Sequence, residues 1–152
     1  MAKGSSAPSG SEIRVGTDPA EFDLAWVVSA LSERAYWALG RPREAIVASL
    51  ANSLCYGLFR GRQQVAVARV VTDRATFGWL CDVFVDEAWR GKGLGGRLID
   101  EIVADPRLRD VPRLVLATRD AVELYRRHGG FEPLAAPERF MERDRRELPD
   151  TS

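Results

Sequence analysis

A chain of 152 residues with 45% hydrophobic side chains is long enough for one domain with its own core, without help from metals or disulfides. Its 22 basic and 22 acidic side chains cancel, which excludes a global field that would draw the protein to nucleic acid or to a membrane. We therefore expect neither among its partners, and any basic patch must be local.

The two cysteines, Cys55 and Cys81, fit no metal-ligand spacing and lie within apolar runs. Buried, reduced thiols are expected, and no metal site is predicted. No run approaches the roughly 18 apolar residues of a membrane span, and no signal peptide is visible. These features together predict a cytoplasmic location.

Residues 1–11 are rich in Ser and Gly and poor in apolar side chains, which is typical of a disordered leader or tag remnant. The domain is expected to span residues 12–142, and a charged tail to follow at 143–152. A short first strand over 12–15 would precede a helix, whose start is marked by Asp18 as the N-cap with Pro19 behind it.

Residues 33–42 interrupt this helical pattern and carry two adjacent aromatic residues, Tyr36 and Trp37. A second helical pattern opens at Pro42 and continues to Ala51. Aromatic side chains in a connection between helices either line a pocket or cover the core, and both interpretations stay open.

After the second helix the pattern changes to β-strands. Three runs rich in β-branched and aromatic residues are separated by connections short enough for hairpins. These runs cover residues 54–60, 64–72 and 76–85. Three successive antiparallel strands are therefore expected in the middle of the chain.

A glycine-rich loop follows the third of these strands and leads into a helix that ends near Asp105, just before a proline. A strand over 113–118 and a helix from Asp120 to Gly130 come next, and residues 131–134 and 138–142 can form two short final strands. The predicted order is β-α-α-β-β-β-α-β-α-β-β. This is an α/β (α+β) fold with a mixed, mostly antiparallel, twisted sheet of six or seven strands and about four helices.

The most informative stretch runs from Val83 to Arg97, where an apolar strand leads through a basic glycine loop into an amphipathic helix. Glycines let backbone amides approach a ligand, and amides at a helix N-terminus bind anions. Arg90, Lys92 and Arg97 add full positive charges. The stretch therefore predicts a site for a phosphate compound.

Three phosphate-binding motifs compete for this loop. A Walker loop requires Ser or Thr directly after its lysine, and no hydroxyl residue follows Lys92. The dinucleotide fingerprint Gly-x-Gly-x-x-Gly is present as Gly91, Gly93 and Gly96. That fingerprint belongs in the first crossover of a doubly wound sheet, whereas three antiparallel strands come first here.

The third motif is Arg90-Gly91-Lys92-Gly93-Leu94-Gly95, which resembles the pyrophosphate loop Gln/Arg-x-x-Gly-x-Gly/Ala of the GNAT superfamily of N-acetyltransferases. The stretch from Ala121 to Phe131 resembles that family's second signature, Ala-x-x-Leu-Tyr followed by Gly-Phe. With a strand between the two motifs and the element order given above, the chain is similar to the family over roughly residues 12–142.

The resemblance implies that the chain transfers the acetyl group of acetyl-CoA to a primary amine, by direct attack through a tetrahedral intermediate and without a metal. It implies that the backbone of Val83, Phe84 and Val85 holds the pantetheine arm and polarises the thioester. The pyrophosphate would lie on Arg90, Gly91, Lys92, Gly93, Leu94, Gly95 and Gly96. Thr118 stands where the family often has an asparagine that contacts the cofactor or the helix start, and it offers fewer hydrogen bonds.

Tyr125 is the predicted general acid, because a phenol is protonated at neutral pH and the family's tyrosine at this position points at the cofactor sulfur. Asp82 interrupts an apolar strand. It is either the general base, acting through water, or the ion-pair partner of Arg69, and both roles stay open. His128 lies at a helix end, where a surface role is expected.

The acceptor pocket is expected between the helix–helix connection and the central strands. Its candidate walls are Trp37, Tyr56, Phe77 and Trp79, although core packing explains these aromatic residues equally well. Such walls favour a small acceptor, and the acidic lining that a polyamine would require is not evident. Dimers are common in the resembled family, so a homodimer is a further expectation. The alternative function is a non-catalytic acyl-CoA-binding or sensing module of the same fold.

Overall fold

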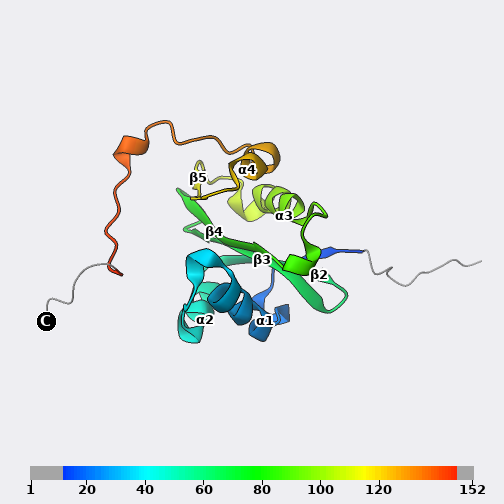
Figure 1. The fold of residues 1–152 in the computed structure, drawn as a ribbon. Coiled ribbons are helices and arrows are strands. Elements are labelled where there is room, and N and C mark those ends of the chain that lie inside the picture. Colours follow the sequence, from blue (N-terminus) through cyan, green and yellow to red (C-terminus); the bar gives the residue numbers. More distant parts are fainter. Residues whose placement is uncertain (1–11, 147–152) are drawn as a thin grey trace, which may run out of the picture.

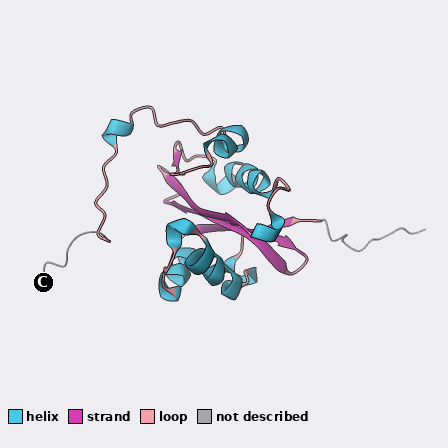
Figure 2. Ribbon diagram, viewed as in Figure 1, coloured by secondary structure: helices cyan, strands magenta, loops and turns pink. Residues whose placement is uncertain are grey.

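A single β-sheet with helices on both faces forms the centre of the computed structural model, which describes residues 12–146 (Figures 1 and 2). The expected leader, 1–11, and the end of the expected charged tail, 147–152, lie outside the described residues. Five strands lie side by side in chain order: β1 (Arg14–Gly16), β2 (Leu54–Arg60), β3 (Gln63–Thr72), β4 (Gly78–Val85) and β5 (Leu114–Val115). Successive strands from β1 to β4 pair antiparallel, whereas β4 and β5 pair parallel.

Two pairs of α-helices cover the sheet. They are α1 (Leu24–Ser29), α2 (Arg43–Ala51), α3 (Leu94–Val103) and α4 (Val122–Gly129). α1 and α2 lie on one face of the sheet, and α3 and α4 lie on the other (Figure 1). α1 continues into a π-helical turn, Ala30–Arg34, and the chain then reaches α2 through a short connection that contains Trp37.

The first helix begins one turn later than the sequence indicated. The Asp18 side chain accepts a hydrogen bond from the amide of Ala20, but the turn that it caps is a short 3₁₀ turn, Pro19–Glu21. α1 itself has Asp23 as its cap, which accepts from the amide of Trp26 at 3.1 Å. Both aspartates follow the N-cap rule, and only the second one starts an α-helix.

The three central strands form the hairpins expected from the sequence. Gly61 takes a positive φ of 60° in the β2–β3 turn, a conformation that favours glycine. The β3–β4 turn is held by Asp73, whose carboxylate accepts hydrogen bonds from the amides of Ala75 and Thr76. The Thr76 hydroxyl also donates to this carboxylate, and this bond together with the two amide bonds holds the pKa of Asp73 below its ordinary value, consistent with the role in turn formation that this residue type favours.

The two final strands expected over 131–134 and 138–142 are wrong, so the sheet has five strands within the described residues. Residues 131–146 contain a 3₁₀ turn, Pro137–Arg139, and no strand. In Figure 1 this segment, orange to red, leaves α4 and adds no strand to the sheet. Pro133 and Pro137 lack the N–H that a sheet ladder requires, which weakens the strand pattern that the neighbouring aromatic residues suggested.

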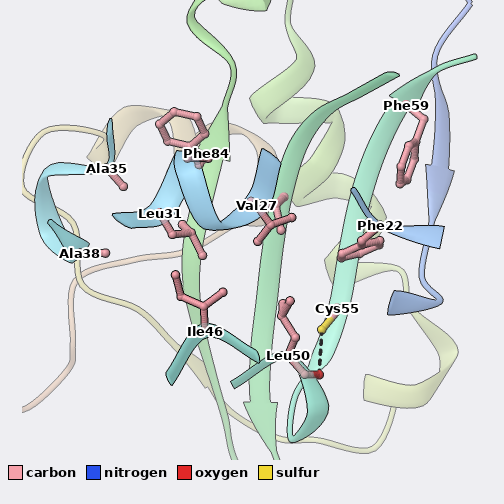
Figure 3. Packing of buried hydrophobic residues seen from close by; sticks show 12 residues of the cluster. Phe22, Val27, Leu31, Ala35, Ala38, Ile46, Leu50, Cys55, Phe59 and Phe84 are labelled. Carbon is pink, nitrogen blue, oxygen red and sulfur yellow. Dashed lines mark hydrogen bonds between the residues drawn. The ribbon is translucent and has the colours of Figure 1, made fainter. Parts of the chain in front are cut away.

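The core consists of two layers, one on each face of the sheet. Val27, Leu31 and Ile46 from the first helices pack with Phe84 of β4 (Figure 3). On the other face, α3 presents a stripe at helical spacing that is fully buried: Leu98, Ile99 and Ile102. Burying each such side chain contributes about 1.5–3 kcal/mol. These two layers fix the sheet between the helices and hold the glycine loop that precedes α3.

β4 contains a β-bulge in its middle. Val67 of β3 lies opposite Phe84, but Arg69, two residues further on, lies opposite Cys81, three residues back along β4. The extra residue changes the side-chain alternation: Leu80 packs on the α3 face, whereas Phe84 packs on the α1/α2 face. Asp82 lies at the bulge with φ +55°, in the left-handed region that Asp tolerates better than most residues.

Candidate active site

β4 and β5 separate after a short paired stretch, and a cleft of about 950 Å³ opens between them. Gly78 and Trp79 of β4 pair with Leu114 and Val115, and no pairing continues beyond. The next part of β4, residues 80–85, lines one side of the cleft. Its backbone groups on this edge have no neighbouring strand, so they are available to a ligand, apart from the Val85 carbonyl, which accepts a hydrogen bond from Arg90. Ala117 and Thr118 line the other side.

The glycine loop closes one end of the cleft. Gly91 and Gly93 both have φ +78°, and a Cβ added at either position would meet no protein atom within 4 Å. Open space therefore lies over the loop. α3 begins at Leu94, and the amides of its first turn have no acceptors within the helix. Loop and helix start together form an anion cradle of the kind that holds phosphate.

The basic residues of the loop have different surroundings. Arg90 lines the cleft, its Nε donates to the carbonyl of Val85 at 2.9 Å, and its guanidinium lies over the Phe84 ring. Lys92 is exposed and is not among the lining residues. Gly96 is buried, and a Cβ there would lie 2.3 Å from the His128 ring. Gly96 therefore allows α3 and α4 to approach each other closely.

Tyr125 projects from α4 and is one of the lining residues of the cleft, half-buried. Its ring packs edge-on against Phe131, with the centroids 5.9 Å apart. Burial, with smaller contributions from the neighbouring Tyr36 and Asp120, raises the pKa of Tyr125 to about 12. The phenol is therefore protonated at neutral pH, as a general acid must be before it donates a proton.

The start of α4 differs from the helix start expected at Asp120. The helix begins at Val122 with Ala121 as the capping residue, whose side chain makes no cap. Thr118 supplies the hydrogen bond, because its Oγ1 accepts from the Ala121 amide at 3.0 Å. Thr118 thus both lines the cleft and fixes the start of the helix that carries Tyr125.

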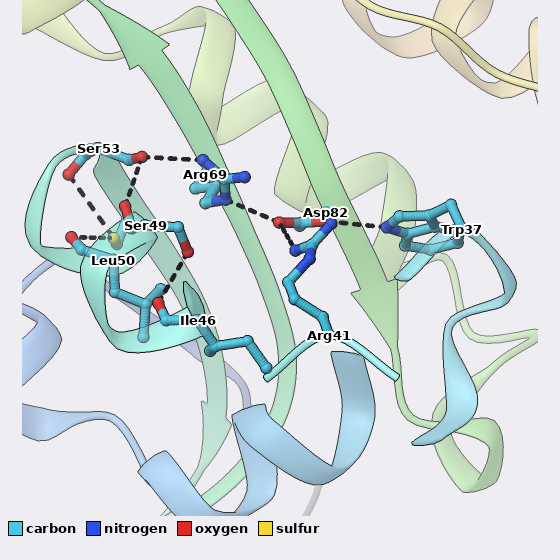
Figure 4. Close-up of polar contacts among 9 residues, drawn as sticks. Trp37, Arg41, Ile46, Ser49, Leu50, Ser53, Arg69 and Asp82 are labelled. Carbon is cyan, nitrogen blue, oxygen red and sulfur yellow. Dashed lines mark hydrogen bonds and ion pairs between the residues drawn. The ribbon is translucent and has the colours of Figure 1, made fainter. Parts of the chain in front are cut away.

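Asp82 is the centre of a buried polar cluster (Figure 4). Its Oδ2 accepts from Arg69 Nε and Arg41 Nη1, each at 2.7 Å, and its Oδ1 accepts from Trp37 Nε1 at 2.8 Å. Burial raises the pKa of Asp82, but the hydrogen bonds and charges of the two arginines outweigh this effect, so the pKa lies below its ordinary value. Of the two roles that the sequence left open for Asp82, the geometry matches the ion pair with Arg69. A carboxylate held in this way is a weak base.

Two of the four candidate walls of the acceptor pocket lie in the cleft, and two do not. Trp37 and Trp79 are lining residues, each 38% exposed. Tyr56 faces the opposite side of the sheet, where it is buried in the α3 layer and donates its hydroxyl proton to Asp105 at 2.7 Å. Phe77 lies just before β4 and is not a lining residue. The expectation for Tyr56 and Phe77 is therefore corrected, because strand alternation and the start of β4 turn them elsewhere.

The lining residues outside the four candidate walls include Tyr36, Arg41 and Cys81. Tyr36 carries the guanidinium of Arg119 over its ring at 3.7 Å. Burial raises the pKa of the Cys81 thiol to about 11, so the thiol is neutral at physiological pH. Only the adjacent aromatic pair at 36–37 gave a sequence signal, whereas Arg41 sits in an irregular connection without any local pattern.

Two classes of site find no support in the part of the chain that the structure covers. No group of three or more His, Cys, Asp or Glu side chains could hold a metal ion among residues 12–146. Over the same residues, none of the helices combines the length and the apolar character that crossing a membrane requires. The cleft itself offers a phosphate cradle, the open backbone edge of β4 and a protonated tyrosine.

The sequence and the fold have counterparts among known proteins. The family model described as "Acetyltransferase (GNAT) domain" matches residues 51–132, which include the glycine loop and Tyr125. A protein of Gibberella zeae that is named as an acetyltransferase is 30% identical over 141 residues, and the match covers 78% of this chain and 78% of that protein.

Solved structures agree with these matches. A crystal structure from Xanthomonas campestris, described as an acetyltransferase of the GNAT family, has a TM-score of 0.84 at 40% identity, covering 88% of this chain and 93% of that one. A GNAT family acetyltransferase from Elizabethkingia anophelis, solved with acetyl-CoA bound, has a TM-score of 0.58 at 15% identity, covering 79% and 75%. At this identity the second likeness is one of fold alone.

Proposed function

The chain belongs to the GNAT acetyltransferase family, and on this premise we propose that it transfers the acetyl group of acetyl-CoA to the primary amine of a small acceptor. One observation carries the proposal: a single cleft joins the glycine loop, the unpaired edge of β4 and Tyr125. These are the three features that acetyl transfer from a phosphate-bearing thioester requires.

The spacing of these features suits a long donor with its phosphates far from its reacting carbon. The side chain of Val85 lies close to Gly95 of the loop, and Cys81 lies close enough to Tyr125 to affect its pKa. Val85 lies four residue steps along β4 from Cys81, which is roughly 13 Å at 3.3 Å per residue. The phosphate cradle and the tyrosine are thus separated along one strand, as the two ends of acetyl-CoA would be.

The free backbone groups of β4 support the binding of the donor. We assign the pantetheine arm of acetyl-CoA to the edge of β4 from Val83 to Val85, where it would add to the sheet in place of a strand. An amide N–H on this edge that donates to the thioester carbonyl would stabilise the oxyanion. One such preorganised donor is worth about 10²–10³ in rate.

The state of the titratable groups supports direct transfer to the amine. Burial raises the pKa of the Cys81 thiol to about 11, which opposes its use as a thiolate nucleophile that would carry the acetyl group. The protonated phenol of Tyr125 is available to donate its proton to the departing CoA sulfur. Asp82 is engaged by two arginines, so we do not assign it the role of general base.

The proposal is tested with purified protein, acetyl-CoA and a panel of small primary amines. Release of free CoA thiol and an acetylated product, identified by mass spectrometry, are the expected results. Binding of CoA is measured separately by calorimetry. Tight CoA binding without thiol release for any amine would instead identify a non-catalytic CoA-binding module, and binding of NAD in place of CoA would overturn the assignment of the loop.

A further inference from the structure

The part of the cleft beyond Tyr125 carries more positive than negative charge. We call this part the acceptor end, and its lining residues are Tyr36, Trp37, Arg41, Arg69, Trp79 and Asp82. Two guanidinium groups face one carboxylate here, so one positive charge is left over. Asp120, the other acidic side chain among the described lining residues, is 67% exposed and lies beside Arg119.

The carboxylate of Asp82 has little capacity left for a ligand. Its Oδ2 already accepts from Arg41 and Arg69, and its Oδ1 accepts from Trp37. The side chain is 2% exposed. An acceptor that carries extra positive charge would therefore meet the surplus arginine charge, and Asp82 is too enclosed and too fully bonded to compensate for it.

The guanidinium of Arg41 has donors to spare. Only its Nη1 is hydrogen-bonded, to Asp82, whereas Nε and Nη2 make no hydrogen bond within residues 12–146. The Arg41 side chain is 25% exposed, so these donors are accessible from the cleft. Arg69 is more enclosed and is bonded through Nε to Asp82 and through Nη1 to Ser53. Figure 4 shows both guanidinium groups directed at the same carboxylate.

Apolar surface flanks these donors. Trp37 and Trp79 are each 38% exposed at the acceptor end, and the Trp37 ring is fixed by its hydrogen bond to Asp82. A planar guanidinium with free N–H groups binds a carboxylate in two parallel hydrogen bonds, and indole faces bind flat apolar groups. The acceptor end thus offers one site for an anion and adjoining surface for an apolar body.

We propose that Arg41, supported by Arg69, binds a carboxylate of the acceptor, and that the acceptor is a small amino acid with an apolar or aromatic side chain. The inference rests on the proposed function, because it takes this end of the cleft as the acceptor site. The anchored carboxylate holds the acceptor with its amino group toward Tyr125, where the donor's thioester lies. A polyamine or a lysine-rich peptide is excluded by the same charge.

The test measures binding and not turnover, so that it is independent of acetyl transfer. α-Amino acids such as phenylalanine and leucine, each paired with its own carboxamide, are titrated by calorimetry into the protein saturated with CoA. We expect each amino acid to bind about tenfold or more tightly than its carboxamide, because the amide lacks the charge that Arg41 recognises.

Arg41→Gln should reduce the ratio of the carboxamide Kd to the amino-acid Kd to about one. Arg43→Gln removes the same charge from an exposed position outside the cleft, and it should leave this ratio unchanged. Arg41→Lys keeps the charge beside Asp82 but loses the planar fork, and it should give an intermediate ratio. Melting curves check that each variant is folded.

Carboxamides that bind as tightly as the amino acids would overturn the inference. So would a preference that survives in both Arg41 variants, or a failure of all the amino acids to bind. Carboxylate-selective binding that depends on Arg41, combined with no thiol release from acetyl-CoA, would contradict the proposed function and leave the anion site standing.

Discussion

Arg69 Nε on β3 donates to Asp82 Oδ2 on β4 at 2.7 Å, at the position where the two strands lose their register. The ion pair therefore lies on the bulge that reverses the side-chain alternation of β4. Because this bulge directs Asp82 toward the first helices, it also allows Arg41 and Trp37 to bond to the same carboxylate. One buried group thus joins β3, β4 and the connection before α2 at the wall of the cleft.

Asp82→Asn should destabilise the protein by about 3–5 kcal/mol, because it leaves two arginines at a largely buried site without their counter-charge. Asn adopts a positive φ at least as readily as Asp, so the backbone conformation is not the cause of the loss. Urea denaturation gives the free energy of unfolding. Glu21→Gln is the control, since its ion pair with Arg14 is exposed and should contribute less than about 1 kcal/mol. Equal losses in the two variants would contradict a special role for the buried pair.

The low pKa of Asp82 predicts a loss of stability in acid. A carboxyl with a lowered folded-state pKa stabilises the fold above its unfolded pKa of about 3.9, and this contribution disappears as the pH falls through the folded-state pKa. The urea concentration at the unfolding midpoint of the native chain should therefore decrease as the pH is lowered below about 4. Asp82→Asn should show a shallower fall over the same range, and parallel curves would argue against this assignment.

Tyr125→Phe should lower kcat by about 10²–10⁴-fold and leave the Kd for CoA nearly unchanged. Phe retains the ring that packs against Phe131, so the fold should persist. Thiol-release kinetics and calorimetry separate the two quantities. Tyr56→Phe is a matched removal of a hydroxyl on the opposite face. It should cost about 1–2 kcal/mol of stability through the lost bond to Asp105, with kcat retained.

The raised pKa of Tyr125, about 12, also predicts the pH profile of kcat. The phenol stays protonated as the pH rises from 7 to about 10, so its deprotonation causes no fall of kcat in this range. A falling limb below pH 10 that disappears in Tyr125→Phe would show that this pKa is lower in the donor complex.

Gly93→Ala should weaken CoA binding by about tenfold or more, because a Cβ enters the open space over the loop and the residue must keep φ +78°. Gly61→Ala imposes a similar strain, of roughly 1 kcal/mol, at φ +60° in the β2–β3 turn, where a Cβ likewise meets no protein atom. Both variants should melt slightly lower. The Kd for CoA should rise in Gly93→Ala alone, and a similar rise in both would mean that strain and not the cradle is responsible.

Features with a local cause could be predicted from the sequence. The β2–β3–β4 hairpins follow from short turns between β-rich runs, and the position of α3 follows from a glycine loop before an amphipathic stripe. The order of elements from β1 to α4 could also be predicted, because each boundary carries a helix cap, a proline or a change in the spacing of apolar residues. Beyond α4 the two predicted strands were wrong, because Pro133, Pro137 and the absence of a neighbouring strand outweigh a weak β pattern in residues 131–142.

The sequence by itself determined the phosphate loop, the family resemblance and the choice of Tyr125 as the candidate general acid, since each depends on a motif of residues close together in the chain. The tertiary structure decided which side chains share the cleft. A bulge in β4 brings Asp82 to Arg41 and Arg69, and strand alternation turns Tyr56 to the opposite face. These outcomes depend on the register between β3 and β4 and on the path of the connection before α2. The strand pattern gives no signal for the bulge, and the path of the connection is set by packing between segments far apart in sequence. Only the pairing of Asp82 with Arg69 could be suggested from the sequence.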